Sequence, residues 1–251
     1  MNIQNTLKTI VFILCTSILM YSCSKDEYYS DGGQAQAKFD GSILDYMDSK
    51  PVLFDTIAQI IRLAGLEETF KNDEFTFFAP SDPDIKDLIG SLEKGGLNSQ
   101  LFGLGLDTIK NLSDVDSAIW RNHLLKYMFR GKNLLKDYPQ IDYSLISTFP
   151  GQHYISFAGN ITNIGVEYQD VIQYDGNGNE TSRLKYMGYR QLNLNYISDE
   201  TNPNNFWQIP VSSSDIQPNN GVIHVLNYTK SSFGLDNGSW EIINDILESK
   251  R

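Results

Sequence analysis

Apolar residues in the first half of the chain recur three and four positions apart, which is the spacing of helices with one buried face. This spacing predicts a helix that begins after Ser42 and a second helix that begins near Pro51. The second helix is expected to end at Ala64-Gly65, because glycine is common just past a helix C-terminus. Further helices are predicted over residues 84–92 and 117–129.

Short runs rich in aromatic and β-branched residues predict strands, and they dominate the second half of the chain. The first such run lies early, at residues 75–79. After Tyr138 the runs follow one another at residues 144–148, 153–157, 165–174, 183–195 and 221–228, separated by clusters of turn-forming residues. Helices followed by a series of strands indicate a mixed α/β (α+β) fold.

Residues 1–22 have the pattern of a secretory leader, in which Lys8 precedes an apolar run of about 12 residues. Such a run is too short to span a bilayer as a permanent helix. It ends in Leu19-Met-Tyr-Ser-Cys23, which resembles the lipobox of bacterial lipoproteins except that Met20 and Tyr21 are unusual there. We therefore expect a lipoprotein signal peptide and an acylated Cys23, the alternative being a signal peptide whose cleavage merely leaves a cysteine.

The count of cysteines agrees with an acylated N-terminus. Of the two cysteines, Cys15 lies in the leader, so Cys23 would be alone in the mature chain and could form no intramolecular disulfide. Several acyl chains anchor a protein firmly to a membrane. Residues 24–27 resemble the acidic stretch that directs lipoproteins of some Gram-negative groups to the outer face of the outer membrane, and residues 23–40 are predicted to be a flexible tether.

Composition places the chain among globular proteins and makes nucleic acid a poor partner. Of its 251 residues, 41% are hydrophobic and 12% aromatic, which suffices for a sizeable core. The net charge is -11, from 20 Lys and Arg against 31 Asp and Glu, so a phosphate backbone would be repelled.

Three separated segments resemble the fasciclin domain. The helix that ends in Ala64-Gly-Leu66, followed by Phe75-Thr-Phe-Phe-Ala-Pro-Ser-Asp82, is similar to the first motif of the family. Residues 120–129 resemble its central Leu-x-Tyr-His segment, and Asn220-Gly-Val-Ile-His-Val-Leu-Asn227 resembles its second motif. Because order and approximate spacing agree over residues 42–229, the chain is identified as resembling a fasciclin-like bacterial surface lipoprotein.

The resemblance implies a compact wedge of two β-sheets with helices packed on one side. Within its motifs, Pro80 can end a strand because it lacks a backbone N–H, and the next residues can cap a helix. Asn220-Gly221 is expected to form a turn with positive φ, and His224 is expected to be a hydrogen-bonded core residue in preference to a metal ligand or a base. The motif residues are Ala79, Pro80, Ser81, Asp82, Tyr127, Asn220, Gly221 and His224.

The chain departs from the family pattern in two places. Tyr127-Met128 stands where the family often has Tyr-His, so the adhesive role linked to that region in animal members is not transferred, and Met128 is expected to fill the core. The second departure is length. We expect a fasciclin domain over residues 41–230 with an inserted β region at about 138–213, followed by a C-terminal linker and amphipathic helix over residues 231–251.

The inserted β region and the C-terminal helix contain the candidate contact residues. Most aromatic residues of the insertion are expected to fill sheet faces, but Phe206 and Trp207 follow turn-forming residues and are predicted at an exposed loop tip. Trp240 lies on the predicted apolar stripe of the C-terminal helix. That helix either closes the core of its own domain or docks on a partner.

The motifs of common enzymes and metal sites are missing from the sequence. The three histidines lack metal-binding spacing, and residues 175–180 resemble a calcium loop in composition but not in spacing, which favours a hairpin turn. No catalytic residue, metal or cofactor is therefore predicted, and the protein is not expected to be an enzyme. The predicted function is adhesion to, or binding of, a surface protein, matrix or glycan, with an accessory role in an outer-membrane nutrient-uptake complex as the alternative.

Overall fold

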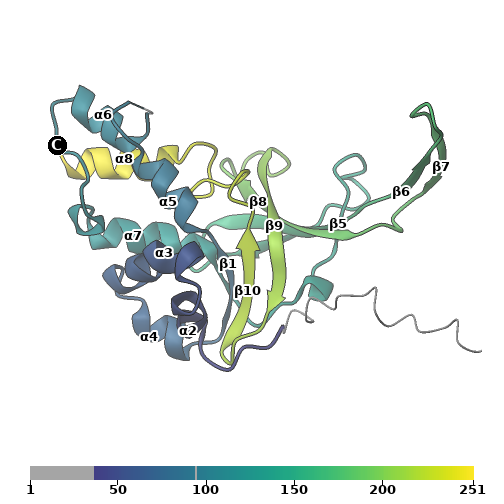
Figure 1. Ribbon diagram of the computed structural model, residues 1–251, viewed down its shortest axis with the longest axis horizontal. Coiled ribbons are helices and arrows are strands. Elements are labelled where there is room, and N and C mark those ends of the chain that lie inside the picture. Colours follow the sequence, from purple (N-terminus) through teal and green to yellow (C-terminus); the bar gives the residue numbers. More distant parts are fainter. Residues whose placement is uncertain (1–36, 94) are drawn as a thin grey trace, which may run out of the picture. The chain divides into compact units, whose positions relative to one another are not determined.

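Helices gather on one side of a curled β-sheet in the computed structural model, which describes residues 37–251 apart from Lys94 (Figure 1). This arrangement confirms the predicted mixed α+β class. Ala37–Arg251 forms one compact unit. The expected signal peptide, Cys23 and residues 24–36 of the expected tether lie outside the described residues.

The predicted helices of the first half are present, but two end earlier than predicted. The helix predicted at 84–92 ends at Ile89, because Gly90 with φ of 62° follows it. Pro51 occupies the first turn of its helix, where its missing N–H costs nothing, and Gly65 follows that helix with φ of 65°. The predicted helix at 117–129 is too long, because Met128 and Phe129 pair with another strand and leave the helix. The helices are α2 (Ile43–Asp48), α3 (Pro51–Leu63), α4 (Glu67–Asn72), α5 (Asp82–Ile89), α6 (Leu97–Gly103), α7 (Ser117–Leu124) and α8 (Trp240–Ser249).

The main sheet has the strand order β2-β1-β10-β9-β8-β5-β3, with β4 also paired to β5. The neighbouring strands β1 and β10 are parallel. The long strand β9 pairs with β8 through its first half and with β10 through its second half, so the expected two sheets are two halves that share β9. The strands are β1 (Phe75–Ala79), β2 (Met128–Arg130), β3 (Gln140–Ile141), β4 (Gln152–Ile155), β5 (Ile161–Tyr168), β8 (Arg190–Ile197), β9 (Phe206–Ile216) and β10 (Gly221–Leu226).

The curl of the sheet brings its two ends together. Phe129 of β2 forms a bridge with Ser156, which follows β4. The Phe157 amide donates to the Met128 carbonyl at 2.9 Å, and the Ala158 amide donates to the Leu125 carbonyl at 3.3 Å. The turn between β4 and β5 is thereby held against the end of α7.

The enlarged central region forms an arm in addition to sheet strands. Strands β6 (Val171–Tyr174) and β7 (Glu180–Leu184) pair only with each other, and their hairpin projects beyond β5 and β8 (Figure 1). The strand predicted at residues 144–148 is wrong. That segment forms turns, because the Asp142 carboxylate accepts hydrogen bonds from the Ser144 and Leu145 amides.

The core lies between the helices and the sheet and is rich in aromatic rings. Phe70 of α4 packs edge-on against two β1 residues, with ring centroids 5.1 Å from Phe75 and 5.0 Å from Phe77. Trp120 of α7 and Tyr127 are fully buried near Phe233. Among residues 37–251, none of the helices has the length and apolar character needed to cross a bilayer.

Candidate functional site

The residues of the first sequence motif join β1 to two helices. Ala79 is buried at the end of β1, and Ser81 precedes α5, with its amide and hydroxyl donating to Asp84 at 2.8 and 3.0 Å. The Asp82 carboxylate accepts from two backbone amides of α3, Thr56 and Ile57, at 3.1 Å each. Together with buried Pro80, these side chains fix the position of α5.

Asn220 ties three elements together immediately before β10. Its side-chain oxygen accepts from the Ile43 amide at 2.8 Å, at the start of α2. Its nitrogen donates to the carbonyls of Phe70 and Asp73 at 3.0 and 2.9 Å, at the end of α4. Free amides and carbonyls at helix ends need such partners, so Asn220 stabilises both helices.

The expected positive φ at Gly221 is wrong. Gly221 is not among the glycines with positive φ, and it lies in β10, paired with Phe75 of β1. Its lack of a side chain is required for a different reason. A Cβ atom at this position would lie 2.2 Å from the Phe75 carbonyl oxygen and 2.7 Å from the Ile43 Cδ1 atom. Glycine therefore allows a close approach of two backbones.

His224 of β10 is fully buried in the core. Its Nδ1 atom accepts from the Asp215 amide at 3.3 Å, so Nε2 carries the proton and donates to the Asn133 carbonyl at 3.0 Å. The ring lies 5.0 Å from the Phe78 ring. Burial lowers the pKa of His224 to about 4, which keeps the imidazole neutral at physiological pH.

Tyr127 anchors the segment that leads into α8. Its hydroxyl donates to the Ser232 carbonyl at 3.2 Å and accepts from the Gly234 amide at 2.8 Å. Its ring stacks on Phe233 with centroids 5.7 Å apart. Burial raises the pKa of Tyr127 well above its ordinary value, so the hydroxyl stays protonated.

The C-terminal helix α8 packs on its own domain. Its buried side chains are Ile242, Ile243, Ile246 and Leu247. Of the two alternatives from the sequence, closure of the domain's own core is therefore what the structure shows. The expected place of Trp240 on the apolar stripe is wrong, because this first residue of α8 is 59% exposed.

Phe206 and Trp207 do not form a loop tip. They begin β9, because pairing with β8 takes them into the sheet, where Trp207 lies opposite Tyr196 and remains 38% exposed. Directly opposite residues of an antiparallel pair share one face of the sheet. Trp207 is thus the cross-strand neighbour of Tyr196, and the Tyr196 hydroxyl donates to Glu241, the residue after Trp240. Trp207 is therefore related to Glu241 through its strand partner Tyr196, and Trp240 through its place in the sequence.

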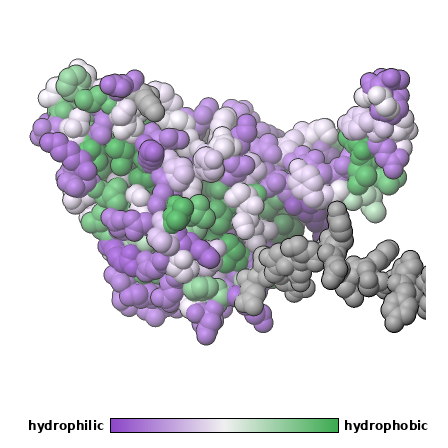
Figure 2. All heavy atoms as spheres, in the orientation of Figure 1, coloured by the Kyte–Doolittle hydropathy of each residue, from purple (hydrophilic) through white to green (hydrophobic). Residues whose placement is uncertain are grey.

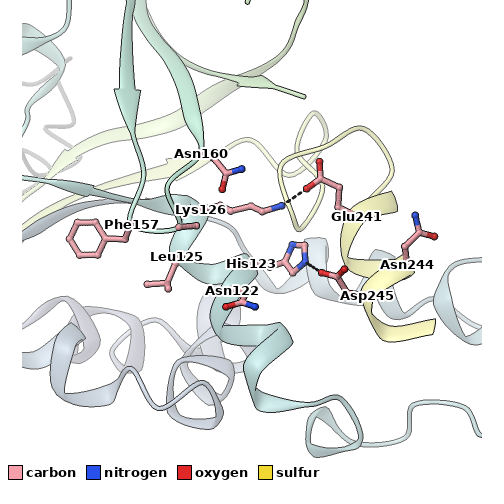
Figure 3. A pocket seen from close by; sticks show the side chains of 10 residues that line it. Asn122, His123, Leu125, Lys126, Phe157, Asn160, Glu241, Asn244 and Asp245 are labelled. Carbon is pink, nitrogen blue, oxygen red and sulfur yellow. Dashed lines mark hydrogen bonds and ion pairs between the residues drawn. The ribbon is translucent and has the colours of Figure 1, made fainter. Parts of the chain in front are cut away.

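Glu241 lines a hollow of about 550 Å³ between α7, α8 and the turn after β4 (Figure 3). His123 of α7 bonds through Nε2 to the Asp245 carboxylate at 2.7 Å. Lys126 and Tyr196 both donate to the Glu241 carboxylate. Two residues of the α7 end are therefore linked to two residues of α8.

The hollow contains one pair of opposite charges, Lys126 and Glu241, whereas His123 faces Asp245 as a neutral ring. Burial of the His123 ring lowers its pKa, as does the nearby Lys126 cation, against the opposing effect of Asp245. Burial alone would raise the pKa of Glu241, but the hydrogen bonds from Lys126 and Tyr196 outweigh it and hold the pKa below its usual value. Glu241 is consequently ionised at neutral pH and paired with Lys126.

Three asparagine side chains of the hollow have no partner in the part of the chain that the structure describes. Asn122 lines it from α7, Asn160 from the position before β5, and Asn244 from α8. None of their amide groups bonds to another described residue, and all three are at least partly exposed. Each amide offers two donors and one acceptor oxygen, and the ring of Phe157 lies at the same hollow (Figure 3).

The sequence-based interpretation missed this hollow, although a signal was present. His123 and Lys126 are three apart on one predicted helix, and Glu241 and Asp245 are four apart on another, so each pair occupies one helix face. The sequence pattern does not predict that these two helix faces lie against each other. Within the described residues, no group of three or more His, Cys, Asp or Glu side chains is arranged to hold a metal ion.

Comparison with known proteins gives similarity to solved structures alone. No family model matches the chain, and no curated protein is similar to it. A solved structure of a FAS1 domain pair from the insect cell adhesion molecule Fasciclin I is similar at 17% sequence identity, with a TM-score of 0.43. The similarity covers 75% of this chain and 50% of that one, so the chain spans about half the length of the domain pair.

Proposed function

We propose that the chain is a non-catalytic, fasciclin-like surface lipoprotein that binds a hydroxyl-bearing ligand, in adhesion or in ligand capture, at the hollow between α7 and α8. The observation that carries this proposal is the set of three amides, on Asn122, Asn160 and Asn244, that have no partner among the described residues. The charged groups beside them already have partners, since Lys126 pairs with Glu241 and His123 donates to Asp245. Hydroxyl groups both donate and accept hydrogen bonds, as carboxamides do. Neutral amides thus suit a glycan better than they suit an ion.

Exposed aromatic rings extend the proposed contact surface. Phe157 lines the hollow itself. Trp207 is the strand partner of Tyr196, which donates to Glu241 of the hollow, and Trp240 directly precedes Glu241. Aromatic rings offer flat apolar faces on which sugar rings can pack. The sequence around Cys23 predicts a lipid anchor, and an anchor of this kind would hold the domain at the membrane, where the proposed ligand binding would take place.

Binding is tested on a glycan array and by titration calorimetry with any glycan that the array identifies. We expect Asn160→Ala and Trp207→Ala to weaken binding at least several-fold without unfolding the domain, since both side chains are partly exposed. Asn98→Ala is the matched control, because the Asn98 amide lies away from the hollow and bonds to Ile109. Equal losses in all three variants would contradict the site.

The lipid anchor is tested separately by mass spectrometry of the native protein and by cell fractionation. An acylated Cys23 at the mature N-terminus is expected, together with release of Cys23→Ala from the membrane fraction. Surface display predicts that external protease reaches the domain on intact cells, and that joint replacement of Lys25, Asp26 and Glu27 by alanine abolishes this access. Membrane retention of Cys23→Ala would refute the anchor.

The alternative, an accessory lipoprotein that docks on an outer-membrane uptake complex, is favoured by the β6–β7 arm. This arm carries exposed apolar side chains, as Figure 2 shows, and exposed apolar patches often mark interaction sites. A two-stranded hairpin alone is only marginally stable, so a partner would also stabilise the arm. The exposed side chains are Val171, Tyr174 and Leu184 on the hairpin and Met187 and Tyr189 beyond it. Loss of transporter co-purification in Leu184→Ser with Met187→Ser, while glycan binding persists, would support docking through the arm.

A further inference from the structure

A second cleft, of about 950 Å³, adjoins the hollow and has the opposite charge to the chain as a whole. The two share Leu125 and Phe157 in their linings. The basic side chains of the cleft are Arg121, Arg130 and His153, and no aspartate or glutamate lines it. In a chain with 31 acidic and 20 basic residues, this local excess of cations needs an explanation.

Neither arginine of the cleft is paired with a carboxylate of the described residues. Arg121 projects from α7, and its Nη1 atom donates to the carbonyls of Ala64 and Gly65 at 3.1 and 3.2 Å. These bonds hold the guanidinium in place at the end of α3. The Nε and Nη2 donors of Arg121 have no partner among the described residues.

Arg130 is positioned by an aromatic ring. It ends β2, and its guanidinium carbon lies 5.8 Å from the centroid of the Phe157 ring. Stacking on a ring uses the face of the guanidinium and leaves its N–H edge available. Both arginines thus keep donors with the planar geometry that suits carboxylate and sulfate groups.

The rest of the cleft is apolar and aromatic. Tyr154 and Phe157 are partly exposed, and Ile155 is largely exposed. A ligand for this cleft therefore combines an anionic group with a flat, partly apolar body. Leu125 and Phe157 separate the cleft from the neighbouring hollow, which presents the unpartnered amides of Asn122 and Asn160. A ligand that occupies both could therefore also bind through hydroxyl groups.

We propose that the cleft binds an anionic saccharide, whose carboxylate or sulfate group pairs with Arg121 and Arg130 while a sugar ring packs on Phe157. The proposal rests on the proposed ligand-binding function and names the class of ligand. An acidic peptide would satisfy the arginines, but it would leave the amides of the adjoining hollow without hydroxyl partners. The net charge of -11 repels anions at long range, so recognition depends on these local donors.

The experiment uses titration calorimetry on the full-length protein in detergent with probes of matched length. The probes are an oligogalacturonate, its fully methyl-esterified neutral form, a sulfated oligosaccharide and an oligoglutamate peptide. We expect the oligogalacturonate or the sulfated form to bind at least about tenfold more tightly than the ester, since charge-assisted hydrogen bonds are lost in the ester. The tighter of the two charged forms identifies the anionic group.

Arg130→Gln should remove this preference for charge, with unchanged thermal unfolding. Arg190→Gln is the matched control, because the Arg190 guanidinium also lies over a ring, 4.7 Å from the Tyr168 centroid, but outside the cleft. Arg121→Gln is a less specific test, because the hydrogen bonds of Arg121 to Ala64 and Gly65 also support α3. The preference should survive in Arg190→Gln.

Three results would overturn the proposal. They are equal binding of the charged and esterified probes, equal losses in Arg130→Gln and Arg190→Gln, and oligoglutamate binding as tight as that of the saccharides. Equal binding of the charged and neutral saccharides, weakened by Asn160→Ala, would leave the proposed function standing and remove only the anionic site. The two failures are thereby distinguishable.

Discussion

Replacement of Gly221 by alanine measures how closely β1 and β10 approach each other. The new Cβ atom would lie 2.2 Å from the Phe75 carbonyl oxygen, where ordinary contact needs well over 3 Å, so the two strands must separate by about 1 Å. Overpacking costs about 1–3 kcal/mol, and we expect the upper end, about 3 kcal/mol, because the obstacle is a backbone atom that cannot rotate away. For a unit of this size, that loss lowers Tm by about 6–12 °C.

The control is Gly131→Ala. Gly131 has φ of 81°, but the nearest atom to its added Cβ is 3.8 Å away, so this variant reports backbone strain without a clash. Such strain costs about 1–2 kcal/mol. Thermal and urea unfolding followed by circular dichroism compare the two variants. If Gly221→Ala were no less stable than Gly131→Ala, the steric explanation for glycine in β10 would be wrong.

Three further predictions follow from the hydrogen bonds and burial of single side chains. Asn220→Ala should lose about 2–4 kcal/mol in urea unfolding, because it leaves the amide of Ile43 and two carbonyls of α4 unpaired, whereas exposed Asn219→Ala should be nearly neutral. The pKa of His224 is lowered from 6.5 to about 4, so between these pH values the unfolded chain binds a proton at His224 and the folded chain does not. The free energy of unfolding should therefore fall by up to about 3 kcal/mol as the pH drops from 6.5 to 4. An unaltered pH dependence in His224→Gln would contradict this assignment. Trp120→Ala should unfold the domain at moderate temperature, since Trp120 is fully buried, whereas Trp207→Ala should keep its Tm.

Periodicity predicted local elements well, because helix and strand patterns depend on residues close in sequence. Pro51 and Gly65 mark the ends of α3 as expected. The prediction failed where a distant strand competed with local preference. Met128 continues the helical spacing of α7, but it pairs with Phe77 of β1 and leaves the helix. The residues near Met128 in the sequence give no indication that β1 lies beside it.

The candidate site was less predictable than the fold, for a related reason. The hollow exists because the end of α7, the turn after β4 and α8 meet, and its hydrogen bonds join His123 to Asp245 and Lys126 to Glu241. In the sequence, each of these residues looks like an ordinary polar position on a helix. Trp207 is 38% exposed, but it lies in β9 and not at the predicted loop tip, and Trp240 lies off the apolar stripe on which it was predicted. The register of β8 and β9 was needed to relate Trp207 to Tyr196.

The parallel pairing of β1 with β10 has a consequence for how the chain reaches its native state. The centre of the sheet joins segments that are far apart, since Asn220 bonds to Phe70 across 150 residues and to Ile43 across 177 residues. Long-range pairings of this kind slow folding, because the closure of a large loop precedes the contacts that reward it. During synthesis, α2, α3 and β1 emerge well before β10. Strand β1 is therefore synthesised long before its parallel partner β10 is available. A chain that ends after β9 would lack β10, the strand that joins β1 to β9 in the sheet.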